Sequence, residues 1–186
     1  ALLPLPPMAI ALRLFLVCGL ISIAVATTNT NANNATSIDQ LINQVCNKTG
    51  KAYANICMRS LSRANNKGVT DVFGLGATAI RVASKRASAT SAYASALVKQ
   101  DAAGDSKLKQ IFSDCVDSLN SLTGNLAQAA GDFSTKHYDM VVDDLSEDLD
   151  DVKACKDSCA GVPKLSLLAK RCETVVSFSN IILDLT

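Results

Sequence analysis

Apolar residues recur at spacings of three and four along much of this chain, and this periodicity restricts the fold more than any other feature of the sequence. Spacings of three and four place side chains on one face of an α-helix, where they can be buried together. The clearest of these seams lies between Gly104 and Gly131 and consists of Leu108, Phe112, Cys115, Leu119, Leu122, Leu126 and Ala129. The segment is therefore predicted to be a long amphipathic helix.

Three further segments are predicted to be helical. Val72, Leu75, Ala79 and Val82 begin the seam of residues 69–102, which continues into an Ala/Ser-rich stretch. The next seam has Tyr138, Val142, Leu145, Leu149 and Val152, and the last has Leu165, Leu168, Cys172, Val175, Ser179 and Ile182. The expected dividers are Gly68, Gly104, Gly131 and Gly161, with Pro163 in the first turn of the last helix. Four helices joined by short links predict an all-α, up-and-down four-helix bundle.

The first 26 residues are predicted to be a leader with a secretory signal peptide. Arg13 precedes an apolar run of 13 residues, Leu14 to Ala26, which ends in small residues. This run is shorter than the roughly 18 to 20 residues of a membrane-spanning helix, so no membrane anchor is expected. Residues 27–37 form a polar tail that is expected to be disordered. The remaining residues, 38–186, are predicted to form one domain.

Six cysteines follow the leader, and an even number in a secreted chain favours disulfide bonds. Cys46 and Cys57 could close a local loop that ties two short helical turns into an N-terminal hairpin. Cys115 and Cys155 lie at comparable distances from the turn between two antiparallel helices, where a bridge is geometrically easy. A third bridge, between Cys159 and Cys172, is left open because Cys172 also fits a buried thiol in a helical seam.

Charge and residue types exclude several functions. Beyond Arg13, the chain has 17 basic and 17 acidic residues, and this balance argues against nucleic acid as a partner. The single histidine, His137, has no evident nucleophile as a partner, so no catalytic residues are predicted. No cofactor is expected. The acidic residues of 143–151 have neither the ligand spacing nor the glycine of a calcium loop. They are predicted to form a solvated helix face rather than a metal site. Two alternatives stay open: a surface complementary to a basic target enzyme, and internal pairing with the basic face formed by Arg81, Lys85 and Arg86.

Several segments together resemble the plant invertase and pectin methylesterase inhibitors. They are the Cys46 to Cys57 hairpin, Asp71-Val-Phe-Gly-Leu-Gly-Ala, Leu108-Lys-Gln-Ile-Phe-Ser-Asp-Cys-Val-Asp-Ser-Leu119, Asp132-Phe-Ser-Thr-Lys-His-Tyr-Asp139 and Leu149-Asp-Asp-Val-Lys-Ala-Cys155. The likeness extends from Ile38 to Leu185 and is greatest to a branch containing pollen allergens described as invertase inhibitors.

The resemblance implies a four-helix bundle with an N-terminal helical hairpin and two disulfides, Cys46 to Cys57 and Cys115 to Cys155. It further implies a non-catalytic, secreted inhibitor, monomeric when free. Such a protein would bind one-to-one over the active-site cleft of pectin methylesterase or acid invertase, in the cell wall (apoplast) rather than the vacuole.

The choice of target depends on a few positions. Characterised invertase inhibitors carry Pro-Lys-Phe where this chain has Tyr138, Asp139 and Met140, whereas Tyr-Asp is similar to pectin methylesterase inhibitors. The latter usually have Thr at position 154 and an acid at position 121, where this chain has Ala154 and Ser121. The Tyr138-Asp139 pair favours pectin methylesterase as the target. Because Ser121 and Ala154 depart from the usual residues of its inhibitors, acid invertase is kept as the alternative. The expected target-binding residues are Ser121, Tyr138, Asp139, Asp150 and Lys153.

Two sequons, at Asn34 and Asn47, are predicted sites of N-glycosylation in a secreted chain.

A rival interpretation is a non-inhibitory bundle that is purely structural or encloses a small apolar ligand. The regular Leu, Val and Phe seams favour a packed core instead, so the inhibitor is the preferred interpretation.

Overall fold

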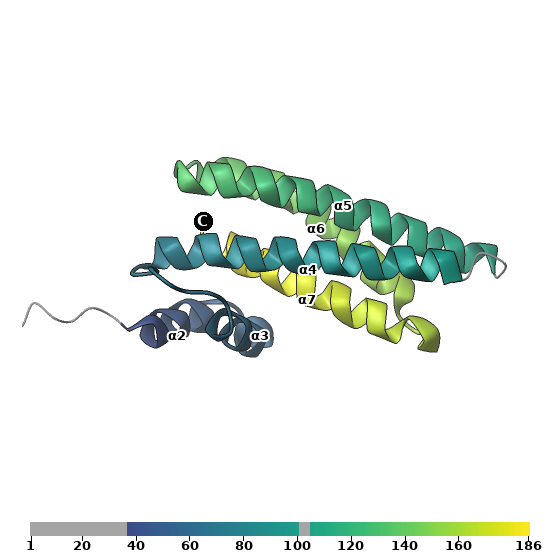
Figure 1. Cartoon of the computed structure of the whole chain (residues 1–186), viewed down its shortest axis with the longest axis horizontal. Coiled ribbons are helices and arrows are strands. Elements are labelled where there is room, and N and C mark those ends of the chain that lie inside the picture. Colours follow the sequence, from purple (N-terminus) through teal and green to yellow (C-terminus); the bar gives the residue numbers. More distant parts are fainter. Residues whose placement is uncertain (1–36, 101–104) are drawn as a thin grey trace, which may run out of the picture. The chain divides into compact units, whose positions relative to one another are not determined.

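The computed structural model describes residues 37–100 and 105–186 (Figure 1). The predicted leader, nearly all of the polar tail, the Asn34 sequon and Gly104 lie outside these residues. The described helices are α2 (Ile38–Lys48), α3 (Lys51–Ser62), α4 (Val72–Gln100), α5 (Ser106–Ser134), α6 (Tyr138–Cys159) and α7 (Ser166–Leu183), with a short 3₁₀ helix, η1 (Pro163–Leu165), before α7.

Helices α4 to α7 form a four-helix bundle, as the apolar periodicity predicts. Helix α4 packs against α5 and α7, and α6 packs against the same two helices (Figure 1). Helices α4 and α6 therefore lie diagonally across the bundle. No helix in the described residues is both long enough and apolar enough to cross a membrane.

The predicted seams form most of the core, because side chains three or four residues apart share one face of a helix. Leu119, Leu122, Leu145 and Phe178 are fully inaccessible to solvent. Two seam positions are wrong.

Val72 and Val142 are exposed, with 37% and 38% of their surfaces accessible. Val72 is the first residue of α4 and precedes the packed part of the helix. On α6, Val141 is buried and Val142 is not. Neighbouring residues of a helix point in different directions, and here Val141 is the one that faces the core.

The helix boundaries also differ from the glycine pattern. Gly131 does not end α5, which continues to Ser134, and the turn is made at Lys136 with a left-handed φ of 64°. Gly161 does adopt a left-handed φ, 81°, between α6 and η1. Pro163 opens η1, where its lack of an N–H costs no hydrogen bond.

The N-terminal hairpin consists of α2 and α3, each about three turns long rather than the short helical turns expected from the sequence. Ser37 and Gln40 begin α2 with a capping box, in which each side chain accepts a hydrogen bond from the other residue's backbone N–H. The Cys46–Cys57 disulfide joins the two helices, with a Cα–Cα distance of 5.5 Å. Helix α3 packs against α7 and α4, and α2 against α4. The hairpin therefore covers the α4–α7 side of the bundle.

A second disulfide, Cys115–Cys155, joins α5 to α6 with a Cα–Cα distance of 5.1 Å. The third bridge left open by the sequence is not formed, and Cys159 and Cys172 are buried thiols. Burial raises the pKa of both thiols, that of Cys172 to about 12. Even so, Cys172 Sγ lies only 3.4 Å from Cys155 Sγ. One bridge and two protonated thiols thus share the interior between α5, α6 and α7.

Candidate target-binding face

The turn between α5 and α6 orients two of the residues expected to bind a target. The backbone N–H of His137 donates to the carbonyl of Asp132 at 2.9 Å, and the Thr135 hydroxyl donates to the carbonyls of Gly131 and Asp132. These bonds satisfy groups at the end of α5 that have no partner within the helix. Helix α6 then begins at Tyr138.

Tyr138 belongs to an aromatic cluster and is only partly exposed. Its ring meets the edge of Phe133 with a centroid distance of 5.4 Å, and Phe133 stacks on Phe73 at 5.1 Å. The cluster links α4, α5 and α6 at one end of the bundle. Asp139, the next residue, is exposed in the first turn of α6, where the positive end of the helix dipole favours a carboxylate. The packing of Tyr138 therefore fixes the start of α6, and the backbone of Asp139 with it, so that the Asp139 side chain extends into solvent.

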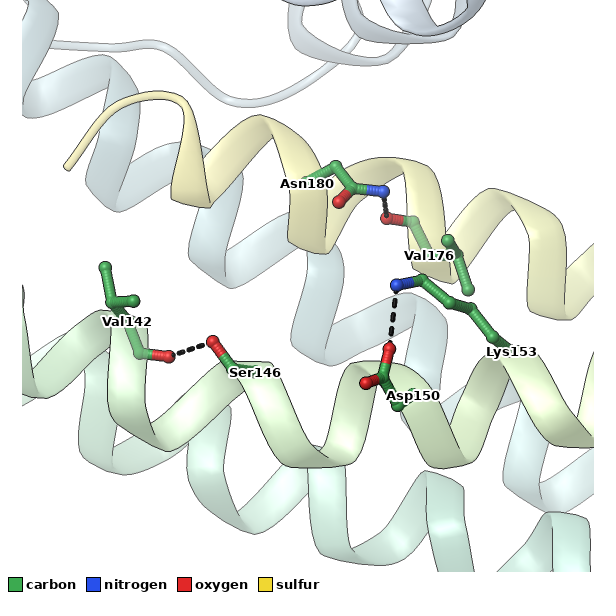
Figure 2. Close-up of polar contacts among 6 residues, drawn as sticks. All are labelled: Val142, Ser146, Asp150, Lys153, Val176 and Asn180. Carbon is green, nitrogen blue, oxygen red and sulfur yellow. Dashed lines mark hydrogen bonds and ion pairs between the residues drawn. The ribbon is translucent and has the colours of Figure 1, made fainter.

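Asp150 and Lys153 form an ion pair about three turns further along α6. The Lys153 Nζ to Asp150 Oδ1 distance is 2.8 Å, and Figure 2 shows the pair where α6 runs alongside α7. In the same region Ser146 and Asn180 donate to the carbonyls of Val142 and Val176 (Figure 2). Asp150 is 78% exposed, and an exposed pair contributes little to stability, about 0.2–1 kcal/mol. Both side chains can therefore rearrange on a partner at small cost.

Ser121 is exposed on α5 and lies level with the Asp150 region of α6. Cys115 is bonded to Cys155, and further along α5 the Asn125 side chain donates to Asp148 at 2.6 Å. In this antiparallel register, Ser121 falls opposite Asp150 or Asp151. The structure thus places Ser121, Asp150 and Lys153 at one level along the bundle, with Ser121 on α5 and the Asp150–Lys153 pair on the part of α6 that runs alongside α7 (Figure 2). Tyr138 and Asp139 lie apart from Asp150 and Lys153, roughly 16 to 23 Å along α6 at about 1.5 Å per residue.

An acidic groove of about 350 Å³ lies between α5 and α6 beside this level. Asp114, Asp117 and Asp151 line it together with Ala154, which places three carboxylates around one opening. Ser121 does not line the groove but lies one helical turn beyond Ser118, which does. The face formed by α5 and α6 suits a partner with complementary positive charge.

The acidic residues of α6 are not all solvated, contrary to the sequence interpretation. Asp148 is 4% exposed and accepts the hydrogen bond from Asn125, so it belongs to the α5–α6 contact. Asp144 is half-buried, and its Oδ2 atom has no solvent access and no hydrogen-bond partner. Burial and the neighbouring Asp132 carboxylate raise the pKa of Asp144. A proton held between Asp132 and Asp144 would satisfy the isolated oxygen. Periodicity alone could not reveal this carboxyl pair, because it joins two helices.

Comparison with known protein families identifies the chain. The family model described as plant invertase/pectin methylesterase inhibitor matches residues 40–185. The chain belongs to this family. The match covers the hairpin from the third residue of α2 onward and the whole bundle, including all of the face formed by α5 and α6.

Solved structures of inhibitors of this family have a similar fold. A mutant form of a pectin methylesterase inhibitor from Arabidopsis matches with a TM-score of 0.66 and 20% sequence identity, covering 77% of this chain and 93% of that one. A pectin methylesterase inhibitor from Arabidopsis thaliana matches with a TM-score of 0.58, also at 20% identity, covering 77% and 92%. No curated protein matches the sequence of this chain. At this identity the structural likeness establishes the fold alone.

His137 and Asn47, two other positions singled out by the sequence, are both exposed. His137 is exposed, and its Nδ1 lies 3.2 Å from the Thr135 hydroxyl, so it is a surface residue of the turn. Asn47 is exposed near the end of α2, but Thr49 of its sequon is buried and donates to the Cys46 carbonyl at 2.8 Å. Glycosylation at Asn47 would therefore require access to the chain before this hydroxyl is buried.

Proposed function

We propose that this protein is a secreted inhibitor of pectin methylesterase that binds one enzyme molecule and covers its active-site cleft with the face formed by α5 and α6. Tyr138 and Asp139 carry the choice of target, because they stand where invertase inhibitors have Pro-Lys-Phe and are similar to the residues of pectin methylesterase inhibitors. Tyr138 is held by Phe133 before a target binds, and the adjacent Asp139 is exposed at the start of α6. Preorganised contacts lose less entropy on association.

Secretion is supported by the apolar leader and by two disulfides, which persist in oxidising compartments. A packed interior, with Leu119, Leu122 and Leu145 fully buried, favours inhibition over enclosure of a small ligand. The acidic groove between α5 and α6 would attract a basic rim on the enzyme and accelerate association at low salt.

Acid invertase is the second candidate, because Ser121 and Ala154 depart from the usual residues of pectin methylesterase inhibitors. Both positions lie on the same face of α5 and α6, and Ala154 lines its groove. A target with a different surface at this level would meet small, uncharged side chains there.

Parallel titrations of plant pectin methylesterase and acid invertase with the oxidised mature protein test the proposal. Complete inhibition of pectin methylesterase at one equivalent, with invertase unaffected, is the expected result. Inhibition of invertase alone would select the second candidate. Inhibition of neither enzyme would reject the proposal.

Two matched pairs of variants test the face. Asp139→Asn is expected to weaken inhibition about tenfold, the loss of one good charged contact. Asp39→Asn is its control, because Asp39 is also exposed in a first helical turn but lies on α2. Tyr138→Phe removes only the hydroxyl and preserves the ring packing, with Tyr53→Phe on α3 as control. Equal inhibition by all four variants would place the contact elsewhere.

A further inference from the structure

A basic groove of about 460 Å³ lies between α3 and α4. Four cationic side chains line it, and all four are exposed: Arg63, Arg81, Lys85 and Arg86. Because α3 packs on α4 and α7, the groove is on the side of the bundle opposite α5 and α6. It is therefore separate from the proposed target-binding face.

Local contacts fix the two central guanidinium groups. Arg81 Nη2 donates to the Asn65 carbonyl at 2.9 Å and to the Thr78 hydroxyl at 3.1 Å. Arg86 Nη2 donates to the Ser60 hydroxyl at 3.3 Å, and its Cζ lies 5.4 Å from the centre of the Phe178 ring. Each guanidinium has five N–H donors, so most of them remain available to a ligand.

None of these cations has a carboxylate partner in the described part of the chain. The ion pairs found there are Asp150–Lys153 and Lys156–Asp157, both on α6. Arg81 and Lys85 are four residues apart on one helix, a spacing at which like charges repel and destabilise the helix. A bound anion would relieve this repulsion and supply acceptors for the free N–H groups.

The positive surface continues beyond this groove onto α7. A smaller adjoining groove shares Arg86 and Ala89 and adds Arg171, whose Cζ lies 4.6 Å from the centre of the Tyr93 ring. The Arg171 Nε atom is buried without a hydrogen-bond partner. Between the cations, Val82 and Ala89 give the larger groove apolar surface. Five cations divided between two adjoining grooves exceed what one small anion can contact, and they fit an extended chain with repeated negative charges.

We propose that this groove binds an acidic polysaccharide, a polymer of sugar units that carry carboxylates. Arginine pairs well with carboxylates because its planar fork can donate two parallel hydrogen bonds. The identity of the polymer rests on the proposed function, since hydrolysis of methyl esters in pectin leaves free carboxylates on the polysaccharide. The groove is free when the opposite face covers the enzyme, so the inhibitor can hold product polymer and enzyme together.

Calorimetric titration with unesterified polygalacturonate, without enzyme, tests the groove. The same polymer with its carboxyls methyl-esterified is the ligand control. Arg81→Gln/Lys85→Gln is expected to lose at least about tenfold in affinity, because two charge-assisted contacts disappear. Lys107→Gln/Lys109→Gln, which removes two exposed lysines at the start of α5, is the charge-matched control and should bind within about twofold of the unaltered protein. Thermal melts verify that each variant is folded.

Several results would overturn the proposal. Equal losses in both double variants would indicate nonspecific charge attraction, and equal binding of the esterified polymer would exclude carboxylate recognition. Polymer binding no tighter than that of inorganic phosphate would indicate a small-anion site. Absence of polymer binding, together with a groove-dependent dimer in sedimentation, would assign the groove to a second copy of the chain. Inhibition of pectin methylesterase is measured separately and should survive Arg81→Gln/Lys85→Gln, so failure of one proposal leaves the other intact.

Discussion

The ring of Phe133 on α5 packs directly against Gly76 on α4, at a position where a side chain on residue 76 would overlap the ring. Phe133 in turn stacks on Phe73 and meets the edge of Tyr138. Because Gly76 has no Cβ, the Phe133 ring can occupy this site on α4. Phe133 then holds the aromatic cluster at the point where α6 begins. This contact explains why glycine is needed in the Phe73-Gly-Leu-Gly76 segment, where it would otherwise weaken the helix.

Gly76→Ala is expected to destabilise the protein by about 1–3 kcal/mol, because the added methyl displaces the Phe133 ring from a packed site. Gly124→Ala is the control, since Gly124 is within α5 and its added methyl meets nothing within 4 Å. That change should be neutral or stabilising, as alanine favours the helix by about 1 kcal/mol. Urea unfolding measures both values. Equal stability of the two variants would contradict the role of Gly76.

Removal of Cys115 is expected to leave Cys155 as a free thiol that can react with Cys172. Cys115→Ser loses a bridge whose loop contributes about 3–4 kcal/mol on the chain-entropy model. It also leaves Cys155 Sγ 3.4 Å from Cys172 Sγ. With oxidised glutathione as the oxidant, we expect a new Cys155–Cys172 disulfide that ties α6 to α7, identified by peptide mass mapping.

The double variant Cys115→Ser/Cys172→Ser is the control for this bridge. It cannot form the new disulfide, so it should remain about 3 kcal/mol less stable than oxidised Cys115→Ser. In the unaltered protein, the raised pKa of Cys172 keeps its thiol protonated and slows attack on the existing bridge. Recovery of Cys155 as a free thiol after oxidation of Cys115→Ser would contradict the predicted pairing.

Asp144 is expected to make stability depend on pH. Burial and the charge of Asp132 raise the pKa of Asp144 above its ordinary value of 3.8. Between that value and the raised pKa, the folded protein keeps a proton that the unfolded chain releases. The contribution of Asp144 to the free energy of unfolding therefore falls as the pH rises through this window.

Asp144→Asn should remove this contribution and gain stability relative to the unaltered protein as the pH rises above the ordinary pKa of 3.8. Asp151→Asn, an exposed carboxylate on the same helix, is the control and should follow the unaltered protein. Chemical unfolding at a series of pH values gives the difference directly. Parallel curves for Asp144→Asn and the unaltered protein would show that Asp144 holds no extra proton.

The sequence by itself determined the helices, the bundle class and the cysteines near enough to pair. Apolar spacing of three and four follows from the helix period, so the seams through Leu119 and Leu168 could be recognised without tertiary information. The same reasoning erred by one residue at Val142, because periodicity leaves the edges of a buried face undefined.

Tertiary structure decided everything that depends on the register between helices. It buried Asp148 against Asn125, placed Phe133 on Gly76 and brought Cys172 to Cys155, although these partners lie on different helices. It also put the acidic face of α5 and α6 opposite the basic groove of α3 and α4. One helix's sequence specifies which face is apolar. Which residues of another helix meet that face is set only when the side chains of both pack together.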